Sequence, residues 1–213
     1  MKADFWHRKW ENDEIGFHQP GVNGLLETYW SQLALCRGDA VLVPLCGKSQ
    51  DMVWLHAAGH PVLGVELSEK ALADFLVENG LQGRSAQHDR FCGYELDDMT
   101  LFCGDFFHLS ADDCQAIKAV YDRAALVALP SEMRVQYAEH MKTILDKAVP
   151  MLLIGLDYDQ ALKAGPPFSV PESEIRDLFG DCYRIEVLHS DTFERKGVAT
   201  TETVYRLIPL NPA

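Results

Sequence analysis

The sequence is poor in basic residues. It contains 19 Lys and Arg against 32 Asp and Glu, so the formal net charge over 213 residues is −13. Binding to a polyanion depends on a basic surface that releases counterions, and this balance therefore argues against nucleic acid or an anionic membrane as the main partner. An anionic ligand of this chain must meet basic groups that are placed locally.

Grouped metal or disulfide ligands are also lacking. The six cysteines are widely spaced and include no Cys-x-x-Cys pair, which argues against a zinc ribbon and against a small disulfide scaffold. The eight histidines show no pair at metal-ligand spacing with Cys or Asp, so we predict no metal site. Reduced thiols are the simplest interpretation, and they favour a cytoplasmic location.

No apolar run is long enough to cross a membrane. The longest, residues 149–156, is far shorter than a membrane span, and the first residues lack the apolar stretch of a signal peptide. Repeats, low-complexity tracts and Ser/Gly-rich linkers are absent as well. We therefore predict a soluble, cytoplasmic protein with a single domain over residues 1–213, and its 47% of hydrophobic residues suffice for a sizeable core.

The first 38 residues differ from the rest and form a predicted N-terminal helical arm. They contain Trp6, Trp10, Phe17 and Trp30. Within residues 22–35 the apolar side chains recur at helical spacing, which predicts an amphipathic helix after an aromatic-rich segment.

From residue 40 onward, short apolar runs alternate with helical stretches, which is typical of βαβ units. Strands are predicted at residues 41–45, 62–66, 99–103, 119–122, 149–156, 183–188 and 203–208. Helices are predicted at residues 49–58, 68–79 (with Ser68 as N-cap), 131–147 and 171–179, while residues 81–98 stay unassigned. The predicted fold is α/β: a doubly wound, mostly parallel seven-stranded sheet with an antiparallel C-terminal edge hairpin, and a ligand beyond the carboxyl ends of the strands.

Two nucleotide motifs can be tested at the end of the first strand, where Gly47 precedes Lys48 and Ser49. A phosphate-binding P-loop requires a further glycine five positions before Gly47, and that position is Leu42. A dinucleotide fingerprint requires three glycines, and only one is present. Both motifs fail, which favours a nucleoside ligand without a pyrophosphate.

Glu66 has the place of a ribose ligand. It follows Gly47 by 19 residues and ends the second predicted strand, where an acidic side chain accepts hydrogen bonds from ribose hydroxyls. Adenosine without pyrophosphate fits both features. A surface ion pair or cap at Glu66 is the structural alternative.

Several segments together resemble the thiopurine S-methyltransferase family. They occur in the family's order over nearly the whole chain: Trp10, residues 17–19 (FHQ), 44–49 (PLCGKS), Trp54, 59–60 (GH), 62–68 (VLGVELS), 122–128 (DRAALVA), 165–171 (GPPFSVP) and 193–195 (FER). The resemblance implies a class I, Rossmann-like methyltransferase that uses S-adenosyl-L-methionine as cosubstrate and methylates the sulfur of aromatic or heterocyclic thiols. It also implies a monomer.

The resemblance also implies roles for individual residues. Cofactor-binding positions would be Trp10, Leu45, Gly47, Glu66, Gly104, Asp105, Phe106 and Arg123. The acceptor would contact Phe17, Arg123, Phe168 and Arg195, with the two arginines orienting it and stabilising its anion so that no dedicated general base is needed. From composition alone, Trp10 could be core, Arg123 part of a structural ion pair and Arg195 a solvated loop residue.

Other functions remain open at this point. The same fold could methylate small soft nucleophiles, such as selenium or tellurium compounds, halide or hydrosulfide, in detoxification and metalloid (tellurite or selenite) resistance. A dinucleotide oxidoreductase is disfavoured because the second and third glycines are missing. A non-catalytic adenosine-binding module is a third possibility that the sequence does not decide.

Overall fold

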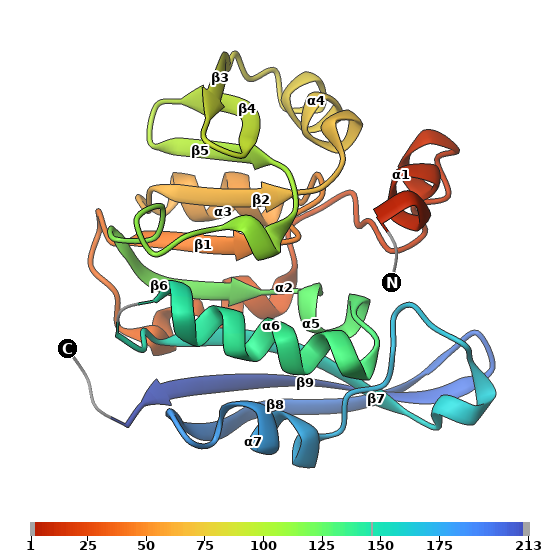
Figure 1. The fold of residues 1–213 in the computed structure, drawn as a ribbon. Helices are drawn as coiled ribbons and strands as arrows, with labels where there is room; N and C mark the ends of the chain where they lie inside the picture. Colours follow the sequence, from red (N-terminus) through yellow and green to blue (C-terminus); the bar gives the residue numbers. More distant parts are fainter. Residues whose placement is uncertain (1–2, 146, 211–213) are drawn as a thin grey trace.

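The computed structural model describes residues 3–145 and 147–210, and its nine strands form one sheet. The strands are β1 (Ala40–Pro44), β2 (Val62–Glu66), β3 (Arg84–His88), β4 (Phe91–Leu96), β5 (Met99–Cys103), β6 (Ile117–Asp122), β7 (Met151–Tyr158), β8 (Tyr183–Arg195) and β9 (Val198–Pro209). Their order is β3-β4-β5-β2-β1-β6-β7-β9-β8 (Figure 1). The five central strands are parallel, and antiparallel strands stand at both edges.

The prediction of an α/β sheet with an antiparallel C-terminal hairpin is confirmed, but the predicted number of seven strands was wrong. The two missing strands are β3 and β4, which form a hairpin in the unassigned residues 81–98. Most β3 side chains are exposed, so the segment lacks the apolar alternation that marks a half-buried strand. Its turns use Asp89 and Asp98 at positive φ, a conformation that Asp tolerates better than most residues.

Helices cover both faces of the sheet. The α-helices are α1 (Ala3–Glu11), α2 (Gly24–Tyr29), α3 (Asp51–Ala57), α4 (Glu69–Glu78), α5 (Ala125–Ala128), α6 (Ser131–Ile144) and α7 (Glu172–Phe179), and the 3-10 helices are η1 (Trp30–Leu33), η2 (Phe106–His108) and η3 (Gln160–Leu162). Side chains alternate along β1, so Leu42 joins the core beneath α6 and α7 while Val41 and Val43 join the core beneath α2, α3 and α4.

Several predicted helix bounds change. The N-cap role of Ser68 is confirmed, because its Oγ accepts the amide hydrogen of Ala71 at 3.3 Å. The predicted helix over residues 22–35 divides into α2 and η1, and the left-handed Ala34 follows it. The helix predicted over residues 131–147 ends at Ile144, and residue 146 lies outside the described part of the chain. The C-terminal hairpin is about twice as long as predicted.

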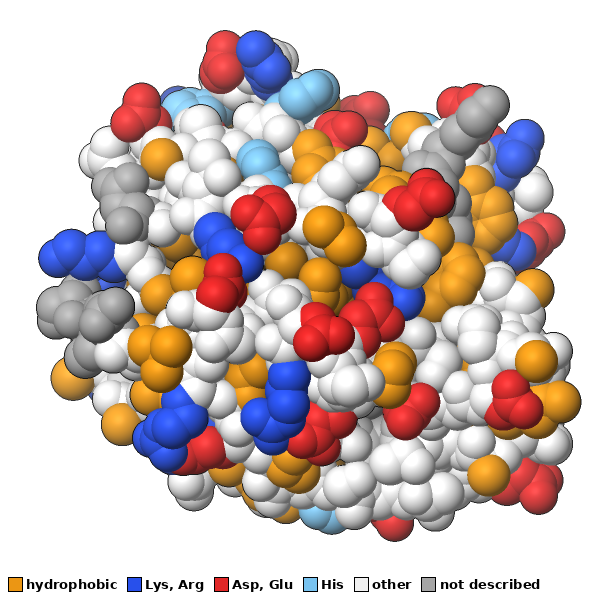
Figure 2. All heavy atoms as spheres, turned by 60° about the horizontal axis from the view of Figure 1, so that its bottom comes forward, with side chains coloured by type: hydrophobic (Ala, Val, Ile, Leu, Met, Phe, Trp, Pro, Cys, Tyr) orange, Lys and Arg blue, Asp and Glu red, His pale blue; other side chains and the backbone are white. Residues whose placement is uncertain are grey.

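The parallel strands all end at one edge of the sheet, on the right in Figure 1, and α1 lies beyond the ends of β1 and β2. On the face shown in Figure 2, acidic and basic side chains are interspersed. Among the described residues, no helix has both the length and the apolar character needed to cross a membrane.

Candidate functional site

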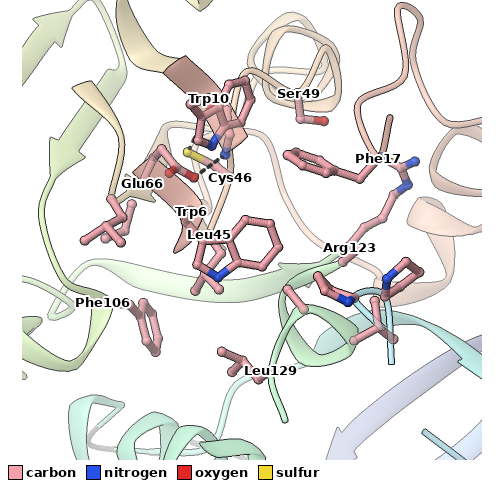
Figure 3. A pocket seen from close by; sticks show the side chains of 18 of the residues that line it. Trp6, Trp10, Phe17, Leu45, Cys46, Ser49, Glu66, Phe106, Arg123 and Leu129 are labelled. Atoms are coloured by element: carbon pink, nitrogen blue, oxygen red, sulfur yellow. Dashed lines mark hydrogen bonds between the residues drawn. The ribbon is translucent and has the colours of Figure 1, made fainter. Parts of the chain in front are cut away.

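A cavity of about 210 Å³ opens at the carboxyl edge of the parallel strands. A second hollow beside β4 measures about 10 Å³, which leaves room for a water molecule only. The large cavity is lined by the predicted residues Trp10, Phe17, Leu45, Gly47, Glu66, Gly104, Asp105, Phe106 and Arg123. In Figure 3, Glu66 and Phe106 lie on one side of it, and Phe17 and Arg123 lie on the other.

The loop after β1 is shaped around the indole of Trp10. Leu45 and Gly47 both have positive φ, at 48° and 54°, so the chain turns sharply between β1 and α3. A Cβ atom on Gly47 would lie 3.1 Å from Trp10 Cζ2, which makes the glycine necessary for this close approach. Trp10 itself is 3% exposed, and its ring meets that of Phe17 edge to face at 5.5 Å.

Glu66 is a buried carboxylate that joins two loops. Its Oε2 accepts the Gly47 amide hydrogen at 2.9 Å, and its Oε1 accepts that of Ser68 at 2.8 Å. Burial raises the pKa of Glu66, whereas these backbone donors act to lower it. The Leu67 amide also acts on this carboxylate. A carboxylate has about four lone-pair sites, so three backbone donors leave capacity for a hydroxyl hydrogen from a ligand.

The segment after β5 borders the same side of the cavity. Gly104 donates its amide hydrogen to Glu66 O at 2.9 Å, and the Asp105 side chain accepts from Phe107 N at 3.0 Å and so caps η2. Phe106 is 5% exposed and packs against Tyr137 at a ring distance of 5.2 Å. The aromatic wall is therefore held by α6.

Arg123 is positioned by a buried hydrogen-bond network. Its Nη1 lies 3.5 Å from Oδ2 of Asp51, which is fully buried. The same Oδ2 accepts the hydroxyl hydrogen of Tyr121 at 2.9 Å, and Oδ1 accepts the Asn23 amide hydrogen at 2.8 Å. Asp51 thereby connects the start of α2 with the guanidinium group. The sequence analysis missed Asp51 because an acidic residue in the first turn of a helix ordinarily reads as a favourable charge at the helix dipole.

Asp122 ends β6, immediately before the cavity-lining Arg123, and is fully buried. Its Oδ1 accepts amide hydrogens from Ala125 and Leu126, and its Oδ2 accepts the Tyr137 hydroxyl hydrogen at 2.7 Å. Burial raises the pKa of Asp122 to about 6, against the lowering effect of these donors. The carboxylate fixes the turn that carries Arg123.

His18 and Lys48 also line the cavity. Lys48 is 7% exposed and forms an ion pair with Glu78 at 2.6 Å, so its charge is largely neutralised. Burial lowers the pKa of His18, and the charges of Lys48 and Arg123 lower it further, while the charge of Glu78 acts in the opposite direction. Both residues lie in segments that resemble the family, residues 17–19 and 44–49, and neither was assigned a cofactor or acceptor role in the sequence analysis.

Two predicted acceptor residues are not brought to the cavity. Arg195 ends β8 at the tip of the hairpin, where its carbonyl accepts a hydrogen bond from Lys163. Phe168 folds back onto Gly165, and its amide bonds Val127 O at 2.6 Å, while the preceding Pro166 and Pro167 line the cavity instead. The hairpin is longer than predicted, and Arg195 lies at its tip, outside the residues that line the cavity.

Further lining residues were not predicted as site residues. Three of them lie in segments of the resemblance, namely Gln19, Val127 and Ala128, and the others lie outside those segments, namely Ala3, Trp6, Leu129, Met133 and Tyr137. Only the folded chain shows that these segments share one wall. In the described residues, no group of three or more His, Cys, Asp or Glu side chains could hold a metal ion.

Solved structures establish the fold. Magnesium protoporphyrin IX methyltransferase from Synechocystis with bound S-adenosylhomocysteine superposes with a TM-score of 0.62 at 15% identity, and the match covers 97% of each chain. The fold is that of class I S-adenosylmethionine-dependent methyltransferases. The single glycine after β1 and the acidic residue that ends β2 agree with a nucleoside cosubstrate.

The family follows from closer relatives. A family model described as thiopurine S-methyltransferase matches residues 1–207. A thiopurine S-methyltransferase of Pseudomonas fluorescens is 47% identical over 97% of this chain and 99% of that protein, and one of Marinobacter nauticus is 45% identical over 98% and 99%. The chain belongs to the thiopurine S-methyltransferase family.

Proposed function

We propose that this enzyme transfers the methyl group of S-adenosylmethionine to the sulfur of an aromatic or heterocyclic thiol such as a thiopurine, giving S-adenosylhomocysteine and an S-methyl thioether. One observation carries the acceptor assignment. Arg123 is the cationic side chain that lines the cavity without a strong carboxylate partner, at 3.5 Å from Asp51, and it faces aromatic and proline side chains.

The residues of the cavity fit the cosubstrate. Glu66 is a buried carboxylate with spare acceptor capacity, which suits ribose hydroxyls. The indole of Trp10 packs closely on Gly47, and both residues line the part of the cavity where the methionine end would lie. The apolar wall of Phe106 and Leu129 suits adenine. When bound, S-adenosylmethionine supplies an electrophilic methyl group on a positively charged sulfur.

The protein's own contribution is alignment and exclusion of water. A cationic donor and an anionic acceptor lose charge as the methyl group moves, so a site with little water favours the transition state. Trp6, Trp10 and Phe17 from the N-terminal arm and Pro166 and Pro167 from the opposite loop form apolar walls. A flat aromatic ring fits between such walls better than a single halide or hydrosulfide ion, which would leave them without contacts.

Arg123 favours the thiolate form of the acceptor. A guanidinium stays charged at every working pH and lowers the pKa of a neighbouring acidic group. A heteroaromatic thiol is already acidic, so the arginine provides the remaining stabilisation and no dedicated general base is needed. Arg195 lies outside the cavity wall, and we propose that it acts from the hairpin tip on the bound acceptor.

The proposal is tested by incubating the protein with methyl-labelled S-adenosylmethionine and a panel of aromatic thiols, small thiols, selenite and tellurite. We expect label on aromatic thiols, and we expect Arg123→Lys to reduce this turnover more than tenfold because a point charge replaces the planar fork. Label on small nucleophiles alone would replace the proposed acceptor class. No transfer to any acceptor, with S-adenosylhomocysteine still bound, would indicate a binding module.

The cellular setting is also a proposal. We propose a cytoplasmic monomer that detoxifies small thiols and requires neither nucleic acid nor a membrane. The six free cysteines and the acidic net charge support it. Resistance to tellurite or selenite is a further prediction, checked by the growth of cells that express the protein on these oxyanions. Sedimentation at micromolar concentration checks the monomer.

A further inference from the structure

Two cysteines stand opposite each other on the antiparallel pair β4 and β5, at the edge of the sheet away from the long hairpin. Cys92 is the register partner of Cys103, so both side chains point to the same face. Directly opposed residues in such a pair have Cα atoms about 4.5–5.5 Å apart, which lies inside the range that a disulfide spans. The Cys92 Sγ lies 3.8 Å from Cys103 O.

The two thiols differ in accessibility. Cys92 is exposed, whereas Cys103 is 9% exposed. Burial raises the pKa of Cys103 to about 12, with contributions from the charge of Cys92 and from a hydrogen bond between the two thiols. An attacking reagent therefore meets Cys92 first, and Cys103 is close enough to react with it afterwards.

Cys103 contacts residues that line the cofactor side of the cavity. Its Sγ lies 3.8 Å from the carbonyl oxygen of Leu67, which lines the cavity beside Glu66. The following residue, Gly104, lines it too and bonds the Glu66 carbonyl. A change in the direction of the Cys103 side chain thus acts on the loop that holds Glu66.

We propose that Cys92 and Cys103 are a modification site that closes reversibly to a cross-strand disulfide in the presence of a low-molecular-weight disulfide, and that closure weakens cosubstrate binding. The Cys92 thiolate attacks one sulfur of glutathione disulfide, whose S–S bond breaks and releases one glutathione. The Cys103 thiolate then attacks Cys92 Sγ and expels the second glutathione. Two protein thiols are oxidised, one glutathione disulfide is reduced, and the two glutathiones carry away the two protons.

The bond is tested by mass spectrometry of the full chain after incubation with glutathione disulfide, followed by a peptide map without reductant. We expect a transient glutathione adduct on Cys92, then loss of two hydrogen atoms with the two strands' peptides linked. Cys103→Ser should leave a stable adduct on Cys92, and Cys92→Ser should abolish the link. The control Cys36→Ser removes another exposed thiol and should change neither. Persistent adducts without a link in the unaltered protein would overturn the proposal.

The functional consequence is tested by calorimetry with S-adenosylhomocysteine, and it rests on the proposed function. Closing the bond turns Cys103 Sγ toward Cys92 and away from Leu67 O, so the oxidised protein should bind several-fold more weakly and recover with reductant. Equal affinities would overturn the coupling to the cavity. If the reduced protein does not bind S-adenosylhomocysteine at all, the proposed function fails, while the disulfide is decided by the mass measurement.

Discussion

The cavity has two sides that are built differently. On the cofactor side, Gly47, Glu66 and Gly104 lie at the ends of three adjacent parallel strands. The Gly47 amide donates to the Glu66 carboxylate and the Gly104 amide donates to the Glu66 carbonyl, each at 2.9 Å. On the acceptor side, Phe17 and Pro166 come from segments about 150 residues apart in sequence, and both belong to connections between elements. The cofactor side is formed at the ends of neighbouring strands, and the acceptor side is formed by loops.

The difference concerns what each side can tolerate. A residue on the cofactor side satisfies the backbone groups of its neighbours, so its loss leaves buried donors without partners. A residue on the acceptor side contributes mainly apolar contact and shape, which neighbouring loops can adjust. We therefore expect substitutions on the cofactor side to weaken cosubstrate binding strongly. Substitutions on the acceptor side should have smaller effects on turnover.

The largest effect is expected from Glu66→Ala. The substitution leaves backbone amides without their acceptor and removes a charged hydrogen-bond acceptor from the ligand site. The affinity for S-adenosylhomocysteine should therefore fall about 100-fold, or about 3 kcal/mol. Calorimetry measures this. The control Glu69→Ala removes an exposed acidic residue from the next helix and should leave the affinity unchanged. An unaltered affinity in Glu66→Ala would contradict the ribose role. It would also contradict the proposed difference between the two sides of the cavity.

Trp10→Ala tests on which side the arm acts. The indole packs on Gly47 and against Phe17, so both sides lose a contact. We expect a weakening of cosubstrate binding of about 30-fold, or about 2 kcal/mol, together with slower turnover. Arg8→Ala, at an exposed position of the same helix that does not line the cavity, serves as the control. A loss of turnover with full cosubstrate affinity would assign the arm to the acceptor side alone.

We expect the buried Asp122 to make the stability of the fold depend on pH. Its folded pKa of about 6 exceeds the usual value of 3.8, so between pH 4 and pH 6 the folded protein keeps a proton that the unfolded chain has released. The contribution of Asp122 to stability thus falls as the pH rises through this window and is constant above it, a change of about 2 to 3 kcal/mol.

Asp122→Asn should remove that fall. The stability of the variant relative to the unaltered protein should therefore rise between pH 4 and pH 6, whatever constant offset the amide introduces. Urea unfolding at several pH values measures it. Asp177→Asn, at an exposed position of α7, should follow the unaltered protein throughout. If the free energy of unfolding of Asp122→Asn changes with pH in parallel with that of the unaltered protein, the Asp122 carboxylate is as easily ionised in the folded state as in the unfolded state.

The sequence predicts the two sides unequally, and the reason is physical. Gly47 and Glu66 stand at fixed distances from strand ends, and periodicity finds strand ends well because buried strands are continuous apolar runs. The C-terminal bounds of β2 and β5 were predicted to the residue. Phe17, by contrast, entered only through the resemblance, since no local pattern marks a loop residue as part of a wall.

What could not be predicted depends on long-range packing. The exposed strand β3 has no apolar signal, and Asp51 gains its role only when Tyr121 and Asn23 converge on it. The position of Arg195 depends on a hairpin that is longer than the sequence pattern indicated, and its predicted role at the acceptor stays a prediction. Tertiary contacts, and not local propensity, decide all three cases.

The smallest effect is expected from Arg195→Ala. Arg195 is half-buried at the hairpin tip and reaches the acceptor side through its field, which also acts on Glu202. We expect kcat/KM for an aromatic thiol to fall about fivefold with unchanged affinity for S-adenosylhomocysteine, since an exposed long-range charge contributes little. Arg184→Ala, at the other end of β8, should alter neither value. If Arg195→Ala weakens cosubstrate and acceptor equally, the hairpin tip supports the whole cavity, and the division into two independently built sides does not hold.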